Sequence, residues 1–406
     1  MDNTRVVVTG LGVVSSIGIG WKKFWNAALK GKSGISRITA FDTRGFKCHR
    51  GGEVKKFNAE DFIPGRKAKF LGRASQLAIA ASMLAVKDSG LPQKNLSGNR
   101  TGVMAGTTMG EKPLEELLFS WVKQGLKDID RRRIMQSAAN NISNNIAINN
   151  KIGGQNYLFP TACAAGNYAI GYGYDLIKNG ELDYVLAGGV DAFFYVSFVG
   201  FQSLYAMSAD KCRPFDKNRK GMIVGEGAGM LLLERLDLAL KRKAHIYAEV
   251  LGYGLSCDAY HPTAPDVSGI THAIEKALLE SGITYKDVQY ISAHGTGTPM
   301  NDKTECRAIK NVLKERYKEV PVTSLKSMLG HCMGAASALE AISCCLTVKT
   351  DVIPPTINFE TLDPECDIDC VPNKARKQRV DIALNNGFAF GGNNSCLVLK
   401  KYGLRG

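Results

Sequence analysis

One cysteine, Cys163, sits among small residues where a predicted strand gives way to a predicted helix. Residues 157–159 are apolar and strand-like, and residues 164–177 are predicted to be a helix with small residues on its first turn. A thiol at a helix N-terminus meets unpaired N–H groups and the positive end of the helix dipole. An effect of up to ~2 kcal/mol would lower the thiol pKa by ~1.5 units. We therefore expect a nucleophile with a lowered pKa, although the pattern also fits an inert buried cysteine.

Two of the six histidines lie in glycine-rich turns, each between a predicted strand and a predicted helix. His294 belongs to ISAHGTGTP (residues 291–299), and His331 to SLKSMLGHCMGAA (residues 324–336). The other four, His49, His245, His261 and His272, lack this setting and are expected to be surface or satisfied histidines. A thiolate can accept an acyl group, and two neutral imidazoles can hold a thioester oxygen while it becomes an enolate. The three residues together therefore predict acyl-transfer chemistry.

A third glycine-rich segment, NNGFAFGGNNS (residues 385–395), follows a predicted strand near the end of the sequence. A turn of this kind exposes backbone N–H groups, as an oxyanion hole requires. Phe388 and Phe390, set among glycines, could form a movable apolar gate. The alternative is an ordinary tight turn with core aromatic residues.

Strand-like and helix-like runs alternate along the chain, which predicts an α/β fold with largely buried sheets. Strands are expected at residues 6–9, 102–106, 184–189, 230–233, 246–250, 289–293, 320–324, 382–385 and 395–399. Helices are expected at residues 76–88, 164–177, 236–242, 270–281, 303–314 and 334–347. Gly252 divides the chain into two comparable halves, residues 1–251 with the cysteine and residues 252–406 with the two histidines and the Phe turn.

Composition narrows the class of protein. The 406 residues are 45% hydrophobic and 22% charged, which is typical of a soluble globular protein. No apolar run approaches the ~18 residues that span a bilayer, and no signal-peptide pattern is present, so we expect a cytoplasmic protein without membrane insertion. The eleven cysteines are scattered and show no zinc-site spacing. No metal and no organic cofactor are expected.

The net charge of +14 (52 basic less 38 acidic residues) fits an acidic protein partner, a membrane surface or nucleic acid. No nucleic-acid motif is present, so nucleic acid is not expected.

A dinucleotide fingerprint is also disfavoured. The run that starts TGLGVVS at Thr9 has Ser15 where the third glycine belongs, and no acidic residue follows at ~20 residues.

Taken together, these segments resemble the condensing enzymes of the thiolase superfamily, and above all the chain-elongating β-ketoacyl-acyl carrier protein synthases of type II. The resemblance covers essentially the whole chain. It rests on TAC (residues 161–163), RPFD (213–216) with GEGAG (225–229), HGTGTP (294–299), KSM with GH (326–331) and FAFGG (388–392). It implies a five-layered α-β-α-β-α sandwich of two pseudo-equivalent halves, in an acyltransferase of fatty acid biosynthesis that is usually a homodimer.

The resemblance also implies roles for single residues. Cys163 would accept the acyl group, and its backbone N–H would form the oxyanion hole with that of Phe390, which would also gate the acyl pocket. His294 and His331 would assist malonyl decarboxylation, with Lys326 as their electrostatic support. The further implied positions are Glu305 as a buried structural carboxylate, Thr296 and Thr298 for pantetheine, Met109 at the deep end of the acyl pocket, and Arg66, Lys67 and Lys69 for docking the acidic carrier protein.

The chain departs from the family pattern outside the catalytic set. Leu325 and Leu329 stand at threonine-like positions, Gly387 replaces serine, and Ala389 replaces the glycine between the two phenylalanines. Lys220 and Met222 replace an acidic and an aromatic residue. Because alanine tolerates positive φ less well than glycine, we expect a stiffer or differently shaped gate.

Four rival functions stay open to test. A thiolase needs a second catalytic cysteine where this chain has Phe390, and an initiating synthase with a Cys-His-Asn set is disfavoured by His331. A non-catalytic chain-length partner subunit typically lacks the cysteine that is present here. The same condensation in a polyketide, polyene or specialised lipid pathway cannot be separated by sequence from bulk fatty acid synthesis, and neither can the preferred acyl chain.

Overall fold

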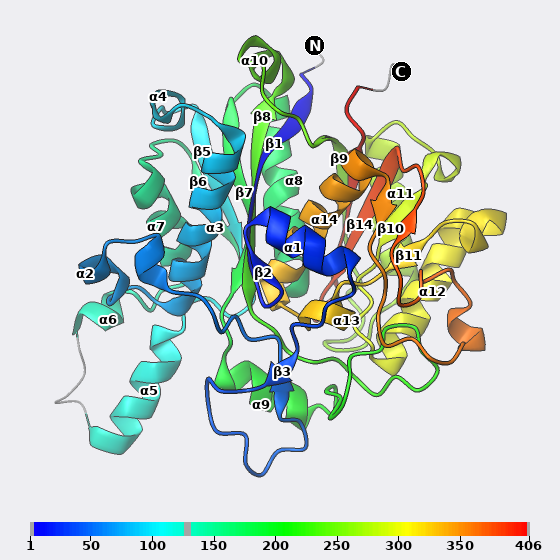
Figure 1. The fold of residues 1–406 in the computed structure, drawn as a ribbon, viewed down its shortest axis with the longest axis horizontal. Helices are drawn as coiled ribbons and strands as arrows, with labels where there is room; N and C mark the ends of the chain where they lie inside the picture. The colour runs from blue at the N-terminus through cyan, green and yellow to red at the C-terminus, as the bar shows by residue number, and fades with distance from the viewer. Residues whose placement is uncertain (1–3, 126–130, 404–406) are drawn as a thin grey trace.

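The computed structural model describes residues 4–125 and 131–403 (Figure 1). The strands are β1 (Val6–Ser15), β2 (Gly18–Ile19), β3 (Ser36–Arg37), β4 (Arg50–Gly51), β5 (Thr101–Gly106), β6 (Asn156–Phe159), β7 (Tyr184–Asp191), β8 (Gly227–Arg235), β9 (Ala248–Cys257), β10 (Tyr290–Ser292), β11 (Val322–Thr323), β12 (Val352–Ile353), β13 (Arg376–Lys377), β14 (Ile382–Phe388) and β15 (Asn393–Lys400). The helices are α1 (Trp21–Leu29), α2 (Gly65–Ala68), α3 (Arg73–Ser89), α4 (Gln93–Leu96), α5 (Pro113–Gln124), α6 (Arg131–Met135), α7 (Asn141–Asn150), α8 (Ala165–Lys178), α9 (Tyr195–Ser203), α10 (Leu236–Lys241), α11 (Val267–Glu280), α12 (Pro299–Leu313), α13 (Lys326–Leu329) and α14 (Ala336–Thr350).

The main sheet consists of two five-stranded groups with the same topology. The first has the order β6-β5-β7-β8-β1 and the second the order β11-β10-β14-β15-β9. In each group the first three strands are parallel, and the last two join by antiparallel pairing. The groups meet where β1 pairs with β9. Each strand of one half therefore has a counterpart in the other, with β6 matching β11 and β7 matching β14.

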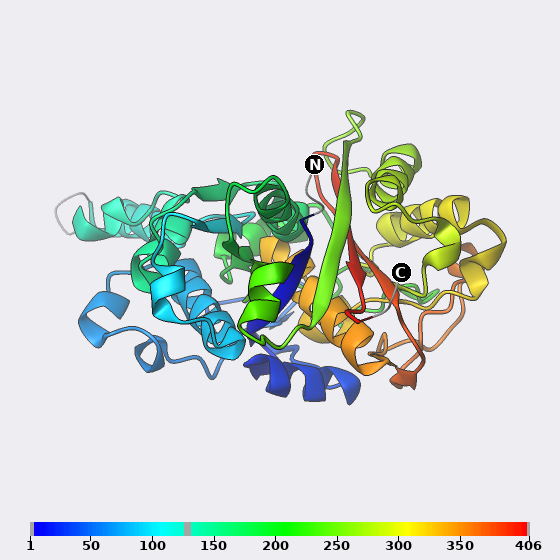
Figure 2. The ribbon, with the colours of Figure 1, turned by 90° about the horizontal axis from the view of Figure 1, so that it is seen from above.

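Helices form three layers around the two groups of strands (Figures 1 and 2). Helices α3 and α7 cover the outer face of the first group, and α11 and α12 cover that of the second. Helices α8 and α14 lie between the groups and touch strands of both. The predicted five-layered sandwich of two equivalent halves is confirmed.

The central position of α14 follows from its composition. Every residue from Ala336 to Val348 is buried, as expected of a helix with apolar or small residues on all sides and a single charged one, Glu340. Helices α8 and α14 pack closely where Gly166 faces Ala338, because a Cβ on Gly166 would lie 2.7 Å from the backbone nitrogen of Ala338. This contact brings the start of α8, next to Cys163, against the second half of the chain.

Most expected elements are present, but several were not foreseen. Helices α1, α5, α7 and α9 were not predicted from the sequence. The expected division after residue 251 falls inside β9, which begins at Ala248 and pairs with strands of both halves. Among the described residues, no helix is both long and apolar enough to cross a bilayer.

Candidate active site

Cys163, His294 and His331 line a single cavity of about 360 Å³, although they come from three separate segments. Cys163 lies in the 3₁₀ turn Ala162–Ala164 between β6 and α8. His294 follows β10, and His331 follows α13 in the loop after β11. All three therefore sit beyond the carboxyl ends of parallel strands, where α/β sheets commonly place functional groups.

The turns that carry Cys163 and His331 occupy equivalent positions in the two halves. Each follows the edge strand of its group, continues as a 3₁₀ turn (Ala162–Ala164 or Met333–Ala335), and leads into a central helix. The first residue of each turn has the same left-handed conformation, with φ of 49° at both Ala162 and Met333. Such a conformation is strained for a residue with a side chain and is held by its surroundings.

The Cys163 side chain is almost fully buried, with 8% of its surface exposed. Burial raises its pKa to about 12, because a thiolate loses its hydration there; the charge of Lys326 acts in the opposite direction. The structure does not bear out the lowered pKa predicted from the helix N-terminus. Burial acts in the opposite direction and favours a neutral thiol in the free protein.

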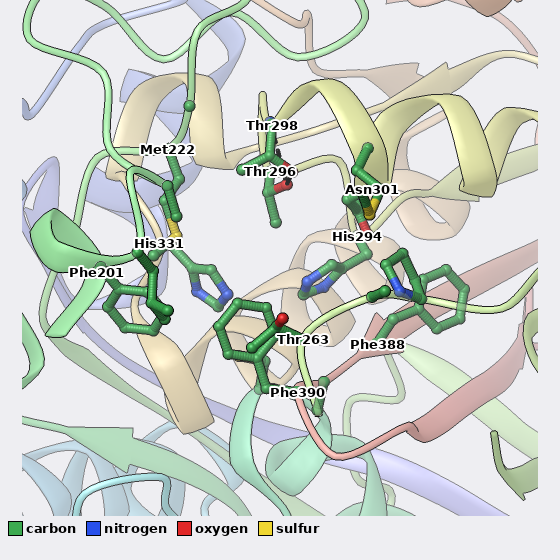
Figure 3. Close-up of a pocket in the computed structure, with 18 of the residues that line it drawn as sticks. Phe201, Met222, Thr263, His294, Thr296, Thr298, Asn301, His331, Phe388 and Phe390 are labelled. Atoms are coloured by element: carbon green, nitrogen blue, oxygen red, sulfur yellow. Dashed lines mark hydrogen bonds between the residues drawn. The ribbon is translucent and has the colours of Figure 1, made fainter. Parts of the chain in front are cut away.

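The two histidine rings face one another across the cavity (Figure 3), with centroids 5.3 Å apart and ring planes at 79°. Both side chains are buried, and burial together with the positive charge of Lys326 holds both pKa values well below the usual range. Both imidazoles are therefore neutral at physiological pH. The backbone N–H of Met333 donates to Nδ1 of His331 at 3.1 Å, so the ring proton of His331 is on Nε2.

Lys326 is itself buried and forms an ion pair with Glu340, with Nζ 2.6 Å from Oε1. Burial raises the pKa of Glu340 to about 7, and Lys326 opposes that rise. The sequence reasoning identified Lys326 but missed Glu340. A lone charged residue in the otherwise uncharged stretch from Ala336 to Val348 is the signal that could have revealed it.

Glu305 lies under the His294 turn. Its two carboxylate oxygens accept the backbone N–H groups of His294 at 2.8 Å and Gly295 at 2.7 Å. Burial raises its pKa to about 7, and these N–H bonds oppose the rise. The carboxylate thus fixes the backbone from which the His294 ring enters the cavity.

Phenylalanines form part of the wall and mouth of the cavity. The ring of Phe390 is 41% exposed and packs on that of Phe201 from α9, with centroids 5.7 Å apart (Figure 3). Phe388 is buried and packs against His294 at 5.7 Å. Ala389 does not have a positive φ; that conformation falls on Gly391 and Gly392 in the same turn. Phe201 was not identified from the sequence.

Thr296 and Thr298 also line the cavity, where their hydroxyl oxygens are 2.8 Å apart. His261, which the sequence reasoning set aside, lines it too. Met109 does not; it packs in the neighbouring core, in the turn after β5. Arg66, Lys67 and Lys69 are exposed on and beside the short helix α2.

This geometry suits acyl transfer to a thiol followed by stabilisation of an enolate. Within the described residues, the backbone N–H groups of Cys163 and Phe390 donate no hydrogen bond to another residue, so both are available to an oxyanion. Neutral imidazoles stabilise an enolate oxygen as hydrogen-bond donors. The largely apolar surroundings strengthen each of these interactions.

Comparisons with known proteins agree with this geometry. The family model "Beta-ketoacyl synthase, N-terminal domain" matches residues 3–239, and "Beta-ketoacyl synthase, C-terminal domain" matches residues 247–360. The "3-oxoacyl-[acyl-carrier-protein] synthase 2" of Synechocystis sp. is 42% identical over 99% of each chain. Two solved structures are similar over 98–99% of this chain and all of theirs: "The ishigamide ketosynthase/chain length factor" (44% identity, TM-score 0.95) and a type II PKS ketosynthase in complex with its acyl-carrier protein (34%, 0.90).

Proposed function

Because this chain belongs to the beta-ketoacyl synthase family, we propose that it joins an acyl group held on Cys163 to malonyl-acyl carrier protein and so lengthens the chain by two carbons. The chain is an acyltransferase of the β-ketoacyl-acyl carrier protein synthase type. The observation that carries the residue assignment is the single cavity that holds a buried thiol and two neutral histidines.

In the first step, the sulfur of Cys163 attacks the thioester carbonyl of an acyl carrier protein. The oxygen of the tetrahedral intermediate accepts the backbone N–H groups of Cys163 and Phe390. The bond from the carbonyl carbon to the carrier sulfur then breaks, and the thiol proton of Cys163 ends on the departing carrier thiol. A neutral resting thiol supplies that proton, so the step is balanced without an external acid.

In the second step, malonyl carrier protein replaces the free carrier. Carbon dioxide leaves, and the electron pair of the broken C–C bond forms an enolate whose oxygen accepts hydrogen bonds from His294 and His331. The enolate carbon attacks the acyl carbonyl on Cys163, and the C–S bond breaks. The product is a β-ketoacyl carrier protein, and the Cys163 thiolate takes up a proton from solvent water to return to the thiol.

The remaining residues receive the substrates. We propose that Thr296 and Thr298 bind the pantetheine arm along the cavity wall, that Phe390 opens to admit the acyl chain, and that Met109 limits its length. Met109 lies beyond the present cavity, which fits a pocket that extends only when Phe390 moves from Phe201. Arg66, Lys67 and Lys69 would attract the acidic carrier protein to the mouth.

A second copy of this chain is the proposed partner at the β6 edge. β6 ends its group of strands with one side unpaired among the described residues, and such an edge can pair with another chain. In the same half of the chain, α5 exposes Leu118, Phe119, Trp121 and Val122 to solvent, more apolar surface than a lone helix usually shows. All eleven cysteines are free thiols, which supports a location in the reducing cytoplasm.

The deciding experiment combines purified protein with acyl and malonyl carrier proteins. We expect a mass increase on Cys163 equal to the acyl group, then carbon dioxide release and a product two carbons longer. A Cys163→Ala variant that still condensed the two thioesters would contradict the assignment. A series of acyl chain lengths would define the preferred substrate.

A second candidate is the same condensation in a specialised pathway, with a chain-length subunit as partner. It is favoured by the 44% identity to the ishigamide ketosynthase/chain length factor. Activity of the purified chain alone, as a homodimer by light scattering, would argue for fatty acid elongation. Activity that appears only on addition of a paralogous chain would argue for the heterodimer.

A further inference from the structure

A buried carboxylate outside the proposed catalytic set joins the two halves of the site. Asp191, the last residue of β7, has no exposed surface. Its Oδ1 accepts the Thr107 hydroxyl at 2.9 Å and the backbone N–H of Met109 at 2.9 Å. Its Oδ2 accepts the backbone N–H groups of Thr108 at 2.8 Å and Gly334 at 2.6 Å. Four donors from two loops therefore converge on one side chain.

The bond to Gly334 reaches the turn that orients His331. Met333, with its left-handed φ of 49°, lies between His331 and Gly334, and its N–H is the donor to Nδ1 of His331. The carboxylate of Asp191 accepts the backbone N–H of Gly334 at 2.6 Å. This hydrogen bond is charge-assisted and therefore stronger than one between neutral groups. That bond opposes relaxation of Met333 to an ordinary conformation, in which its N–H would turn away from the ring.

The junction is also closely packed, so the loops cannot shift independently. A Cβ on Gly334 would lie 2.7 Å from backbone atoms of Thr107 and 2.8 Å from Oδ2 of Asp191. Because Gly334 is the counterpart of Cys163 in the second half, Asp191 holds the turn equivalent to the one that carries the nucleophile. The Thr107 side of the junction leads directly to Met109.

We propose that Asp191 is a positioning residue for His331. By holding the Met333–Gly334 peptide, Asp191 fixes the Nε2–H tautomer of His331, and it also ties that turn to the loop of Met109. This proposal rests on the proposed function for its catalytic consequence, although the tautomer itself is a property of the resting protein. The proposal depends on Asp191 being a hydrogen-bond acceptor at both oxygens. An ionised carboxylate only accepts hydrogen bonds, whereas an amide of the same shape would turn an NH₂ group toward two of the four donors.

The test compares Asp191→Asn with two control variants. Thr107→Val removes one donor to Asp191 and keeps the bond to Gly334. Asp88→Asn alters another carboxylate with several donors, from Leu11, Trp21 and Tyr247, which does not line the cavity. Nitrogen NMR of ¹⁵N-histidine-labelled protein, assigned with His331→Asn, reports which ring nitrogen carries the proton. Carbon dioxide release from malonyl carrier protein and acylation of Cys163 are measured in parallel.

For Asp191→Asn we expect a mixture of His331 tautomers and carbon dioxide release that is about tenfold to a hundredfold slower, with acylation less affected. Thr107→Val and Asp88→Asn should retain the Nε2–H form even if their unfolding temperatures fall. An unchanged His331 tautomer in folded Asp191→Asn would overturn the proposal, as would a shift of equal size in Asp88→Asn. If Asp191→Asn does not fold, Thr107→Val is compared with Gly334→Ala, which disturbs the His331 turn directly. A tautomer shift of equal size in these two variants would also overturn the proposal.

The two proposals fail in distinguishable ways. If the unaltered protein neither acylates Cys163 nor releases carbon dioxide, the proposed function is wrong, and the NMR comparison still decides the role of Asp191. If the unaltered protein is active and the tautomer does not respond to Asp191→Asn, only the positioning role is wrong.

Discussion

Lys326 and Glu340 form an ion pair inside the protein, with Nζ 2.6 Å from Oε1 and almost no surface of either side chain exposed. The two residues are brought together by α13 and α14, which flank the His331 turn. Burying two charges is costly unless they remain paired. The pair therefore places a positive charge near both histidines without leaving it uncompensated, and that charge contributes to their low pKa values.

Removal of one partner should be more harmful to stability than removal of both. We expect Glu340→Gln to lower the free energy of unfolding by about 3–5 kcal/mol, because it leaves Lys326 buried without a counter-charge. The double variant Lys326→Met with Glu340→Leu should recover most of that loss. Urea unfolding of the three proteins measures the difference, and a double variant that is less stable than Glu340→Gln would refute this account.

The two active-site histidines should remain neutral well below pH 6.5. Their folded-state pKa values are depressed, whereas the unfolded chain takes up protons on both near pH 6.5. Their contribution to stability is therefore lost as the pH falls below about 6.5. Histidine NMR titration should show neutral rings at pH 6, and Lys326→Met should raise both midpoints. Protonation of either ring at pH 6.5 in the unaltered protein would contradict the prediction.

The thiol of Cys163 should react slowly with iodoacetamide at neutral pH. With its pKa raised to about 12, the thiolate fraction should grow about tenfold for each pH unit between 8 and 10. Peptide mass spectrometry can follow this cysteine separately from Cys257, the exposed one. A Cys163 rate that is already constant above pH 7 would show that the helix dipole outweighs burial after all.

The gate should respond to the residue between the two phenylalanines. We expect Ala389→Gly to raise the acylation rate of Cys163 with long acyl chains severalfold, because glycine loosens the loop by about 0.5–1 kcal/mol. Phe390→Ala should remove the contact with Phe201 and admit longer chains while it weakens control of hydrolysis. Single-turnover acylation across chain lengths measures both effects. Identical profiles for all three proteins would exclude a gate at this position.

Carrier-protein docking should depend on the exposed basic residues of α2. Changing Arg66, Lys67 and Lys69 to glutamate should raise the KM for acyl carrier protein about tenfold or more with little change in kcat. The control changes the equally exposed Lys241 and Lys243, on and after α10, to glutamate. Steady-state kinetics at two salt concentrations separates the variants. An equal effect of both sets would mean that only net charge matters.

The sequence by itself determined the family-level features of the protein. The residue types around Cys163, His294, His331 and Phe390 indicated acyl transfer and a condensing enzyme, because such glycine-rich turns are local patterns. Alternation of apolar runs indicated the α/β class, because period and turn chemistry are encoded over short distances. Helices α1, α5, α7 and α9 escaped this reasoning, because helices of 9–12 residues carry only a weak local signal.

Only the tertiary structure decided how these segments work together. Burial raises the pKa of Cys163, which no local pattern could reveal, because desolvation depends on what covers the sulfur. The partnership of Lys326 with Glu340, the contact of Phe201 with Phe390 and the four donors around Asp191 all join distant parts of the chain. The equivalence of the turns at Ala162 and Met333 also depends on the fold, because it follows from the matching strand orders of the two halves. Long-range contacts are set by how elements pack, and a linear sequence does not state which elements will meet.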